Sequence, residues 1–303
     1  MHSQTGAPPR GLSVPTLATA RGGAAAVVRF ARRKPLGALG GLIVLGMLVV
    51  AIFAPWIAPH DPQEFIEGGS ARLQPPSVRF PMGTDNLGRD ILSRVIYGAR
   101  LSLLVAFVAT VCGTGIGAMI ALLTAYRGGT WDLMAQRFMD ILWAFPSLVI
   151  AIVIIAVLGR STTNVIIAIA IVVIPSAARV VRSAVLVVKE TEYVQAAQAV
   201  GASQWRIMLR YIAPNCMAPY LIMATASLGG AIITEASLSF LGLGVPPPAP
   251  SWGRDLFGSA QKFAELAPWM PIMPGIAISL TVYGFNLLGD AIRDILDPRL
   301  RGG

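Results

Sequence analysis

Charged residues are scarce in this sequence, and their scarcity decides its broad class. Only 13% of the 303 residues are charged, whereas 55% are hydrophobic; soluble domains have roughly a quarter charged residues. Uncharged stretches recur along the chain with the length, about 20 residues, that a helix needs to cross the hydrocarbon layer of a membrane. Because backbone amides must be satisfied within each segment there, we expect an all-α integral membrane protein.

Cysteine and histidine are also rare, which argues against disulfides and metal centres. The two cysteines, Cys112 and Cys216, lie in or beside apolar stretches, so we expect two small core residues. His2 and His60 are far apart, and neither has neighbours at metal-ligand spacing. The chain also lacks a glycine-rich loop that ends in Gly-Lys-Ser or Gly-Lys-Thr. We therefore predict no metal site and no cofactor in this chain.

The apolar stretches predict six membrane-spanning helices. We expect them at Leu36–Ala58, Leu101–Ala125, Leu133–Leu158, Asn164–Val181, Ala218–Leu241 and Pro271–Ile292. The first has the length of a full span, so we expect it to be retained rather than removed as a signal peptide. The net charge of +9 does not indicate nucleic acid binding, because the basic residues cluster at the ends of these spans.

The positions of lysine and arginine predict the orientation. An inside N-terminus places 16 of the 24 basic residues on the inner side, where basic flanks are normally held. With six spans, both termini are then cytoplasmic. We expect residues 1–34 to form a flexible cytoplasmic tail, residues 35–100 the first transmembrane helix and an extracytoplasmic segment, and residues 101–303 the core domain, with a cytoplasmic loop at 188–214.

Two outer segments are too polar to cross lipid. The first ends in an amphipathic pattern of Leu92, Val95, Ile96 and Ala99, which predicts a short helix along the outer surface before the second span. The other, between residues 244 and 270, contains Pro246-Pro247-Pro248, which is incompatible with regular helix and predicts an ordered loop or plug.

The inner loop 188–214 contains two short helical patterns that predict a hairpin. One expected apolar stripe consists of Tyr193, Ala196, Ala197 and Val200, and the other of Trp205, Met208, Leu209 and Ile212. Gly201 separates the two patterns, and Ser203 is a suitable N-cap for the second helix. Small residues at the elbow allow close backbone approach, so this hairpin suits docking into a groove on another protein.

The same loop resembles the EAA loop of ABC importer permeases. The resemblance rests on Gln195-Ala196-Ala197, Gly201 and the run Tyr211-Ile212-Ala213-Pro214. Gln195 stands where the family usually has Glu, so a charge-assisted bond would be absent there. The resemblance implies a coupling helix that inserts into an ATPase subunit. The residues expected to take part are Glu192, Tyr193, Gln195, Ala196, Ala197, Val200, Gly201, Ala202, Ser203, Arg206 and Pro214.

Further motifs resemble the second (C-type) permease subunit of dipeptide, oligopeptide, glutathione and nickel importers. They are Gly83 to Asp90, Glu235 to Gly244, Ser251-Trp252-Gly253, Asn286 to Asp290 and Leu296 to Arg299. The resemblance implies a non-enzymatic subunit of type I permease fold in the bacterial inner membrane, in contact with lipid. It implies a heterodimer with a homologous permease, two ATPase subunits that bind ATP and Mg, and an extracytoplasmic binding protein.

The resemblance does not determine which solute is transported or what some of the residues in the spans do. The solute is expected to be a peptide or similar small molecule, and glutathione or a nickel chelate is the alternative. An ion-coupled secondary transporter would need several ionisable residues at the midplane, and only Glu235 is a candidate. Glu235 can serve transport or packing. The residues assigned to the pathway or to the permease interface are Pro146, Pro175, Glu235, Ser239 and Asn286.

Overall fold

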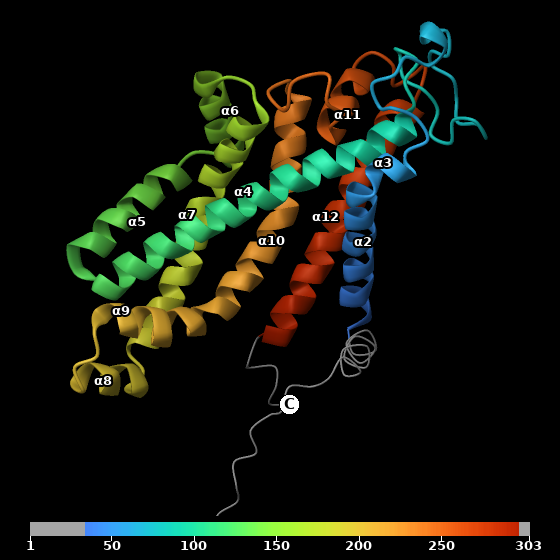
Figure 1. The fold of residues 1–303 in the computed structure, drawn as a ribbon. Helices are drawn as coiled ribbons and strands as arrows, with labels where there is room; N and C mark the ends of the chain where they lie inside the picture. The colour runs from blue at the N-terminus through green and yellow to red at the C-terminus, as the bar shows by residue number, and fades with distance from the viewer. Residues whose placement is uncertain (1–33, 297–303) are drawn as a thin grey trace, which may run out of the picture. The chain divides into compact units, whose positions relative to one another are not determined.

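The computed structural model describes residues 34–296, and from Leu36 onward these form one compact helical unit (Figure 1). The long helices are α2 (Pro35–Ile52), α4 (Ile91–Arg127), α5 (Gly129–Trp143), α6 (Ser147–Leu158), α7 (Thr162–Lys189), α10 (Ala213–Phe240) and α12 (Trp269–Leu296). The short ones are α3 (Ala54–Ile57), a 3-10 turn (Ile66–Gly69), α8 (Glu192–Ala199), α9 (Gln204–Ile207), a π-helical turn (Met208–Ile212) and α11 (Trp252–Ala260). The predicted tail and the motif after Leu296 lie outside the described residues, except for Lys34.

The long helices match the expected membrane spans. Within residues 34–296, five helical stretches are long and apolar enough to cross a membrane, and the number is six if the bent pair α5 and α6 is counted as one span. One of the five runs from Gln204 to Phe240, because α9, the π-helical turn and α10 follow one another without a break. The expected integral membrane fold is thus confirmed for the described part of the chain.

The third predicted span, Leu133–Leu158, is not one helix. It consists of α5 and α6, which meet at an angle of 89°. Pro146 precedes the first residue of α6. Proline lacks a backbone N–H and disfavours helical geometry in the residue before it, so the change of direction occurs there.

Helix α4 begins ten residues earlier than predicted. It starts at Ile91 after the N-cap Asp90, whose carboxylate accepts a hydrogen bond from the Ser93 backbone N–H at 2.9 Å, and it continues without interruption to Arg127. The expected separate surface helix is therefore the first part of α4. The amphipathic pattern and the apolar run that follows it belong to one continuous helix. The predicted boundary between the extracytoplasmic segment and the core domain, at residues 100 and 101, therefore falls inside this helix.

Two glycines allow α4 and α7 to pack closely. A Cβ atom on Gly113 would lie 2.5 Å from the Ala170 carbonyl oxygen, and one on Gly117 would lie 2.5 Å from the Ile174 carbonyl oxygen. Nothing lies within 4 Å of the corresponding position on Gly115. Gly113 and Gly117 therefore form a contact seam of small residues, as such residues do between membrane helices.

Helix α5 is fixed to α7 by a polar contact. The Arg182 guanidinium donates hydrogen bonds to both carboxylate oxygens of Asp132, with Nη2 at 2.7 Å from Oδ2 and Nε at 2.8 Å from Oδ1. Such two-pronged pairs restrict geometry as well as stabilise it. On the next turn Arg179 lies over the Trp143 ring at 3.7 Å from its centroid.

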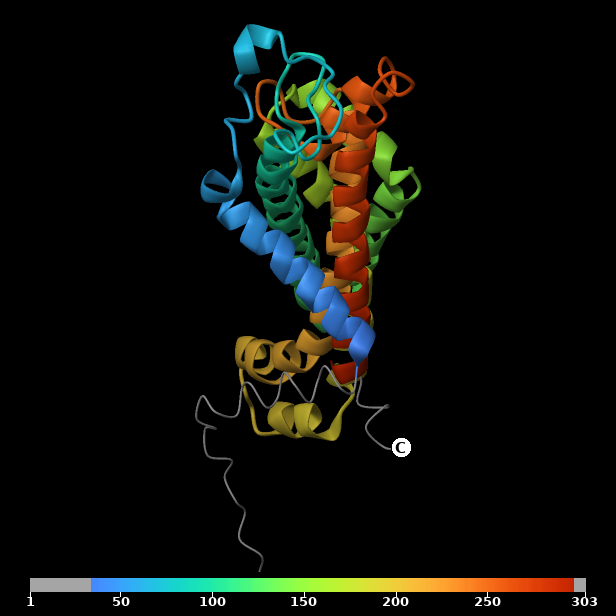
Figure 2. The ribbon, with the colours of Figure 1, turned by 90° about the vertical axis from the view of Figure 1, so that its right-hand side faces the viewer.

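At the end of the unit opposite α8 and α9, helix α11 packs against α4 and α10 (Figure 2). The Trp252 side chain is fully buried, and its indole N–H donates to the Val95 carbonyl at 2.9 Å. Gly253 lies so close to Ala236 that an added Cβ would come within 2.4 Å of its carbonyl oxygen. The predicted proline-rich loop therefore leads into a short, tightly packed helix.

Candidate functional site

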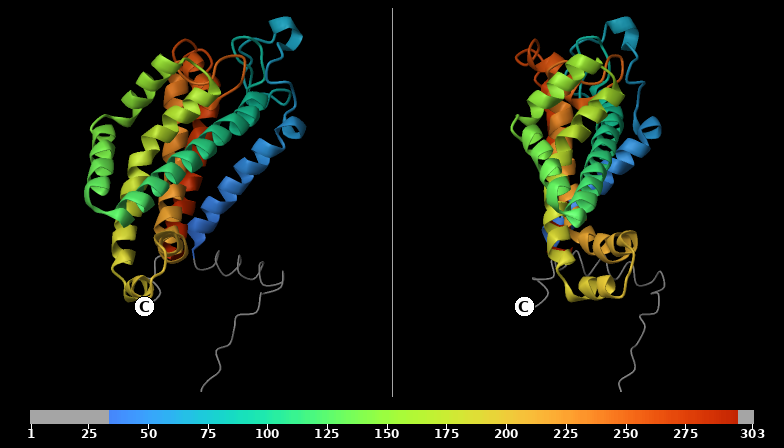
Figure 3. Two further views of the ribbon diagram at one scale, coloured as in Figure 1. Left: turned by 60° about the vertical axis from the view of Figure 1, so that its left-hand side comes forward. Right: turned by 90° about the vertical axis from the view of Figure 1, so that its left-hand side faces the viewer.

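The predicted hairpin is present and lies at one end of the helical unit (Figure 3). We refer to residues Glu192–Ile207, which comprise α8, the elbow and α9, as the hairpin. Figure 1 shows α8 as the outermost helix at that end and α9 next to it, leading into α10. This placement leaves the elbow accessible to another molecule.

The elbow is a helix-terminating turn centred on Gly201. The Gly201 backbone N–H donates to the Gln198 carbonyl at 2.9 Å, and the Ala202 N–H donates to the Ala197 carbonyl at 3.1 Å. This pair of bonds, with a left-handed residue between them, is the Schellman pattern. Gly201 has φ +79°, a conformation that glycine adopts without steric cost.

The second helix starts at the residue expected to cap it. The Ser203 hydroxyl accepts a hydrogen bond from the Arg206 backbone N–H at 3.4 Å, so Ser203 is the N-cap of α9, as predicted. Pro214 is the second residue of α10 and directly follows the π-helical turn. The hairpin is therefore continuous with a membrane-spanning helix.

The predicted apolar stripes of the hairpin are buried only in part. The side chains that face the chain's own core are Val194, Ala197, Ile207, Met208 and Ile212. The other members of the predicted stripes, which are Tyr193, Ala196, Val200, Trp205 and Leu209, are exposed. Ala197, Met208 and Ile212 were therefore assigned to the buried face as the structure has it, whereas Val194 and Ile207 were not.

These exposed side chains form an apolar surface around the elbow. Val200 is 84% exposed and Trp205 is 63% exposed. A Cβ on Gly201 would meet nothing within 4 Å. Large apolar side chains concentrated at an accessible position indicate an interaction surface.

The polar residues assigned to coupling lie on the same accessible end. Glu192, Gln195, Ser203 and Arg206 are exposed, and Ala202 is half-buried. The Gln195 side-chain amide donates to the Glu190 carbonyl at 3.2 Å, so it is held by its own chain. The structure brings all of these residues together on the hairpin, and their contact with an ATPase stays a prediction.

Glu235, which was assigned to the pathway or to an interface, lies inside the chain's own core. Its side chain is fully buried, and its Oε1 accepts a hydrogen bond from the Ser239 hydroxyl at 2.8 Å. Its Oε2 has no hydrogen-bond partner among the described residues. The Ser102 hydroxyl of α4 is likewise buried without a hydrogen-bond partner among the described residues, so the one hydrogen bond of the Glu235 carboxyl lies within α10.

We expect the shape and hydrogen bonding of Glu235 to matter for stability more than its charge. Glu235→Gln keeps an oxygen for Ser239, whereas Glu235→Ala leaves a cavity and an unpaired hydroxyl, which together cost about 2 kcal/mol. Thermal unfolding of the detergent-solubilised protein should show a lower midpoint for Glu235→Ala alone. Ser237→Ala, at a half-buried position of α10, is the control. Equal destabilisation by Gln and Ala would contradict this expectation.

The other residues assigned to the pathway or to the permease interface lie apart from one another. Pro175 is buried inside α7, which continues through it, and Pro146 stands at the bend between α5 and α6. Asn286 on α12 is exposed and lies against Gly229 of α10, whose Cβ would be 2.8 Å from Oδ1. The structure therefore brings only Glu235 and Ser239 into contact, and the role of the group in a pathway stays a prediction.

The sequence matches two protein families. Residues 113–302 match the family described as binding-protein-dependent transport system inner membrane component. The chain belongs to this family. Residues 25–76 match the N-terminal TM domain of oligopeptide transport permease C, so this ABC importer permease also has the additional N-terminal segment of that group.

Curated relatives extend over most of the permease. It is 44% identical over 277 residues to the di/tripeptide transport system permease protein DppC of Pseudomonas aeruginosa, with 90% of each chain covered. It is 43% identical over 271 residues to the glutathione transport system permease protein GsiD of Escherichia coli, with 89% of each covered. The permease is accordingly a multi-pass protein of the bacterial inner membrane.

Solved structures support the fold. The permease resembles the inward-facing MetNI methionine ABC transporter with a TM-score of 0.57 and 18% identity, over 68% of this chain and 98% of that one. It resembles an amino acid ABC transporter with a TM-score of 0.53 and 17% identity, over 68% and 95%. The type I importer permease fold predicted from the motifs is thus confirmed.

Proposed function

We propose that this permease forms half of an ATP-driven import pathway for short peptides or glutathione. The relatives named for di/tripeptide and glutathione transport match it along nine-tenths of its length at 43–44% identity. Similarity along so much of the chain supports a solute of the same chemical class as di/tripeptides and glutathione, which are small molecules with an amide backbone and free carboxylates. The other half of the pathway is a homologous permease.

The hairpin is the element that receives energy from two ATPase subunits, which bind ATP and Mg. The observation that carries this part is the exposed apolar surface around Gly201, where Val200 and Trp205 have no partner in their own chain's core. On this proposal the hairpin end faces the cytoplasm. The opposite end, with α11, faces the binding protein that delivers the solute.

Reconstitution tests the proposal directly. The complex of both permeases, the ATPase pair and the binding protein is placed in proteoliposomes, and uptake of a labelled dipeptide and of labelled glutathione is measured. We expect ATP-dependent uptake of at least one of them, and co-purification of the ATPase subunits with this chain. Uptake that continues without ATP, or a chain that purifies without ATPase subunits, would overturn it.

A further inference from the structure

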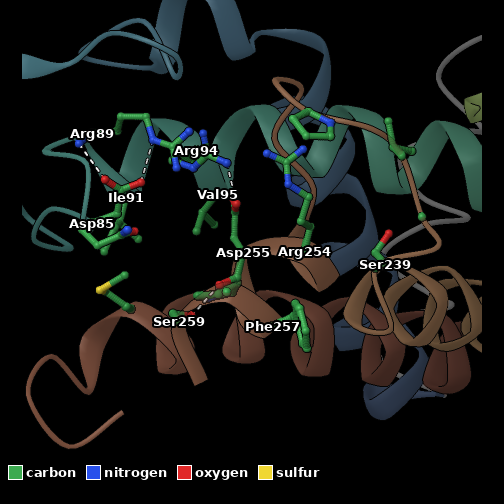
Figure 4. Close-up of a pocket in the computed structure, with 18 of the residues that line it drawn as sticks. Asp85, Arg89, Ile91, Arg94, Val95, Ser239, Arg254, Asp255, Phe257 and Ser259 are labelled. Carbon is green, nitrogen blue, oxygen red and sulfur yellow. Dashed lines mark hydrogen bonds and ion pairs between the residues drawn. The ribbon is translucent and has the colours of Figure 1, made fainter. Parts of the chain in front are cut away.

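A pocket with an excess of positive charge lies at the end opposite the hairpin (Figure 4). Its volume is about 400 Å³, which is within the range of small-molecule sites, about 300–1,000 Å³. The charged residues that line it are Asp85, Arg89, Arg94, Arg160, Arg254 and Asp255. These four arginines and two aspartates give the lining a formal excess of two positive charges.

Two of the arginines are already paired. The Arg89 Nε donates to Asp85 Oδ2 at 2.7 Å, within the loop that leads into α4. Arg94 forms an ion pair with Asp255 and donates through Nη1 to the Pro62 carbonyl at 2.9 Å, and its side chain is 3% exposed. These pairs fix the wall of the pocket, since they join the loop, α4 and α11.

The other two arginines carry the excess charge. Arg254 donates to the Ala249 carbonyl from Nη1 at 3.0 Å, which uses one of the five N–H donors of its guanidinium. Neither Arg254 nor Arg160 forms an ion pair with a carboxylate within 4 Å in the described part of the chain. Arg160 is exposed in the connection between α6 and α7.

The charged guanidinium of Arg254 is partly buried near two other arginines, an arrangement that a bound anion would stabilise. Burial lowers the pKa of its guanidinium from the ordinary value; the neighbouring Asp255 carboxylate opposes this shift, and Arg94 and Arg89 add to it through like-charge repulsion. Figure 4 shows Arg254 directed from α11 toward α4, beside the Arg94 and Asp255 pair. A carboxylate in the pocket would accept from the free N–H groups of Arg254 and offset the repulsion, because planar guanidinium groups match carboxylates in geometry.

We propose that this pocket receives a carboxylate of the incoming solute, held by Arg254 with the support of Arg160. The proposal rests on the function proposed above, which supplies a carboxylate-bearing cargo. A concave site of this size favours a small molecule over a flat protein surface. The arginines would draw the solute's carboxylate from the binding protein toward the mouth of the pathway.

The test uses the complete complex in proteoliposomes with a labelled dipeptide. Arg254→Gln removes the charge, Arg254→Lys keeps it, and Lys262→Gln removes an exposed charge just after α11 that does not line the pocket. Uptake is measured against the concentration of peptide-loaded binding protein. For Arg254→Gln we expect the maximal rate to fall about tenfold, the size of one lost charge-assisted bond, with an unchanged half-saturating concentration. Arg254→Lys should restore most of the rate, and Lys262→Gln should resemble the wild type.

Arg160→Gln provides a second test that does not depend on a buried side chain. Because this residue is exposed, we expect normal assembly and a smaller fall of the maximal rate, about threefold, in the same direction. A raised half-saturating concentration with an unchanged maximal rate would assign the arginines to docking of the binding protein and overturn the proposal. Unchanged kinetics in both Gln variants, or equal loss of rate and thermal stability in Arg254→Lys and Arg254→Gln, would also overturn it. A wild-type complex that imports neither the dipeptide nor glutathione would refute the proposed function instead.

Discussion

Gly201→Trp is expected to abolish ATP-driven uptake while the permease still inserts in the membrane and folds. The side chain of any residue at this position would project into open space, because a Cβ on Gly201 meets nothing within 4 Å in its own chain. If the hairpin enters a groove on an ATPase subunit, the indole would occupy that groove. Uptake and solute-stimulated ATP hydrolysis should both fall below detection in proteoliposomes.

Gly201→Ala is the matched control for this substitution. Both variants carry the same backbone cost, about 1–2 kcal/mol, because φ is +79° and residues with a Cβ are strained in the left-handed region. Only tryptophan adds volume beyond the Cβ. Alanine should therefore retain substantial uptake and co-purify with the ATPase subunits, whereas tryptophan should not. If the two variants transport equally well, the hairpin does not dock through its elbow.

Adding a methyl group to the α4–α7 seam is expected to destabilise the permease strongly. Alanine at Gly113 or Gly117 would place Cβ 2.5 Å from a carbonyl oxygen of α7, so the helices must separate. Overpacking of this kind costs about 1–3 kcal/mol at each site. We expect a lower unfolding midpoint for each single variant and loss of folded protein for Gly113→Ala/Gly117→Ala.

Gly115→Ala on the same helix separates packing from helix propensity. Its Cβ would meet nothing within 4 Å, so only the propensity gain of alanine over glycine is expected, about 1 kcal/mol at most. Unfolding of the solubilised proteins, followed by circular dichroism, gives the comparison. Equal destabilisation at residues 113, 115 and 117 would mean that glycine flexibility, rather than helix contact, is the property that matters.

The sequence predicted the elements whose signals are local. Apolar length located the spans, and Gly201 with Ser203 located the elbow and the cap of α9, since a left-handed turn and an N-cap depend on neighbouring residues alone. The stripes assigned to the hairpin matched its buried face only at Ala197, Met208 and Ile212, because periodicity alone does not show which face will contact the rest of the chain. Pro146 interrupts the third predicted span and can bend it, but the angle of 89° was not predicted, since proline permits a range of bends.

Contacts between distant residues left no mark in the sequence pattern. Arg94 and Asp255 are separated by 161 positions, and neither lies in a motif that indicates a pair. The charge distribution predicted Arg254 and Arg160 in outer segments, and the structure places both in the lining of one pocket. Their convergence depends on how α6, α10 and α11 end, which the sequence pattern does not show. Glu235 and Ser239 are four residues apart on α10, but their burial likewise depends on the packing of α4 against α10.

The unbroken helical path from Gln204 to Phe240 has a mechanical consequence. Its first turns belong to the hairpin, and its last turn carries Ser239, which borders the arginine-lined pocket. A displacement of Trp205 by a moving ATPase would therefore reach the far side of the membrane along a single piece of secondary structure. On the proposed function, nucleotide binding on one face and entry of the solute on the other would then be coupled through this helical path.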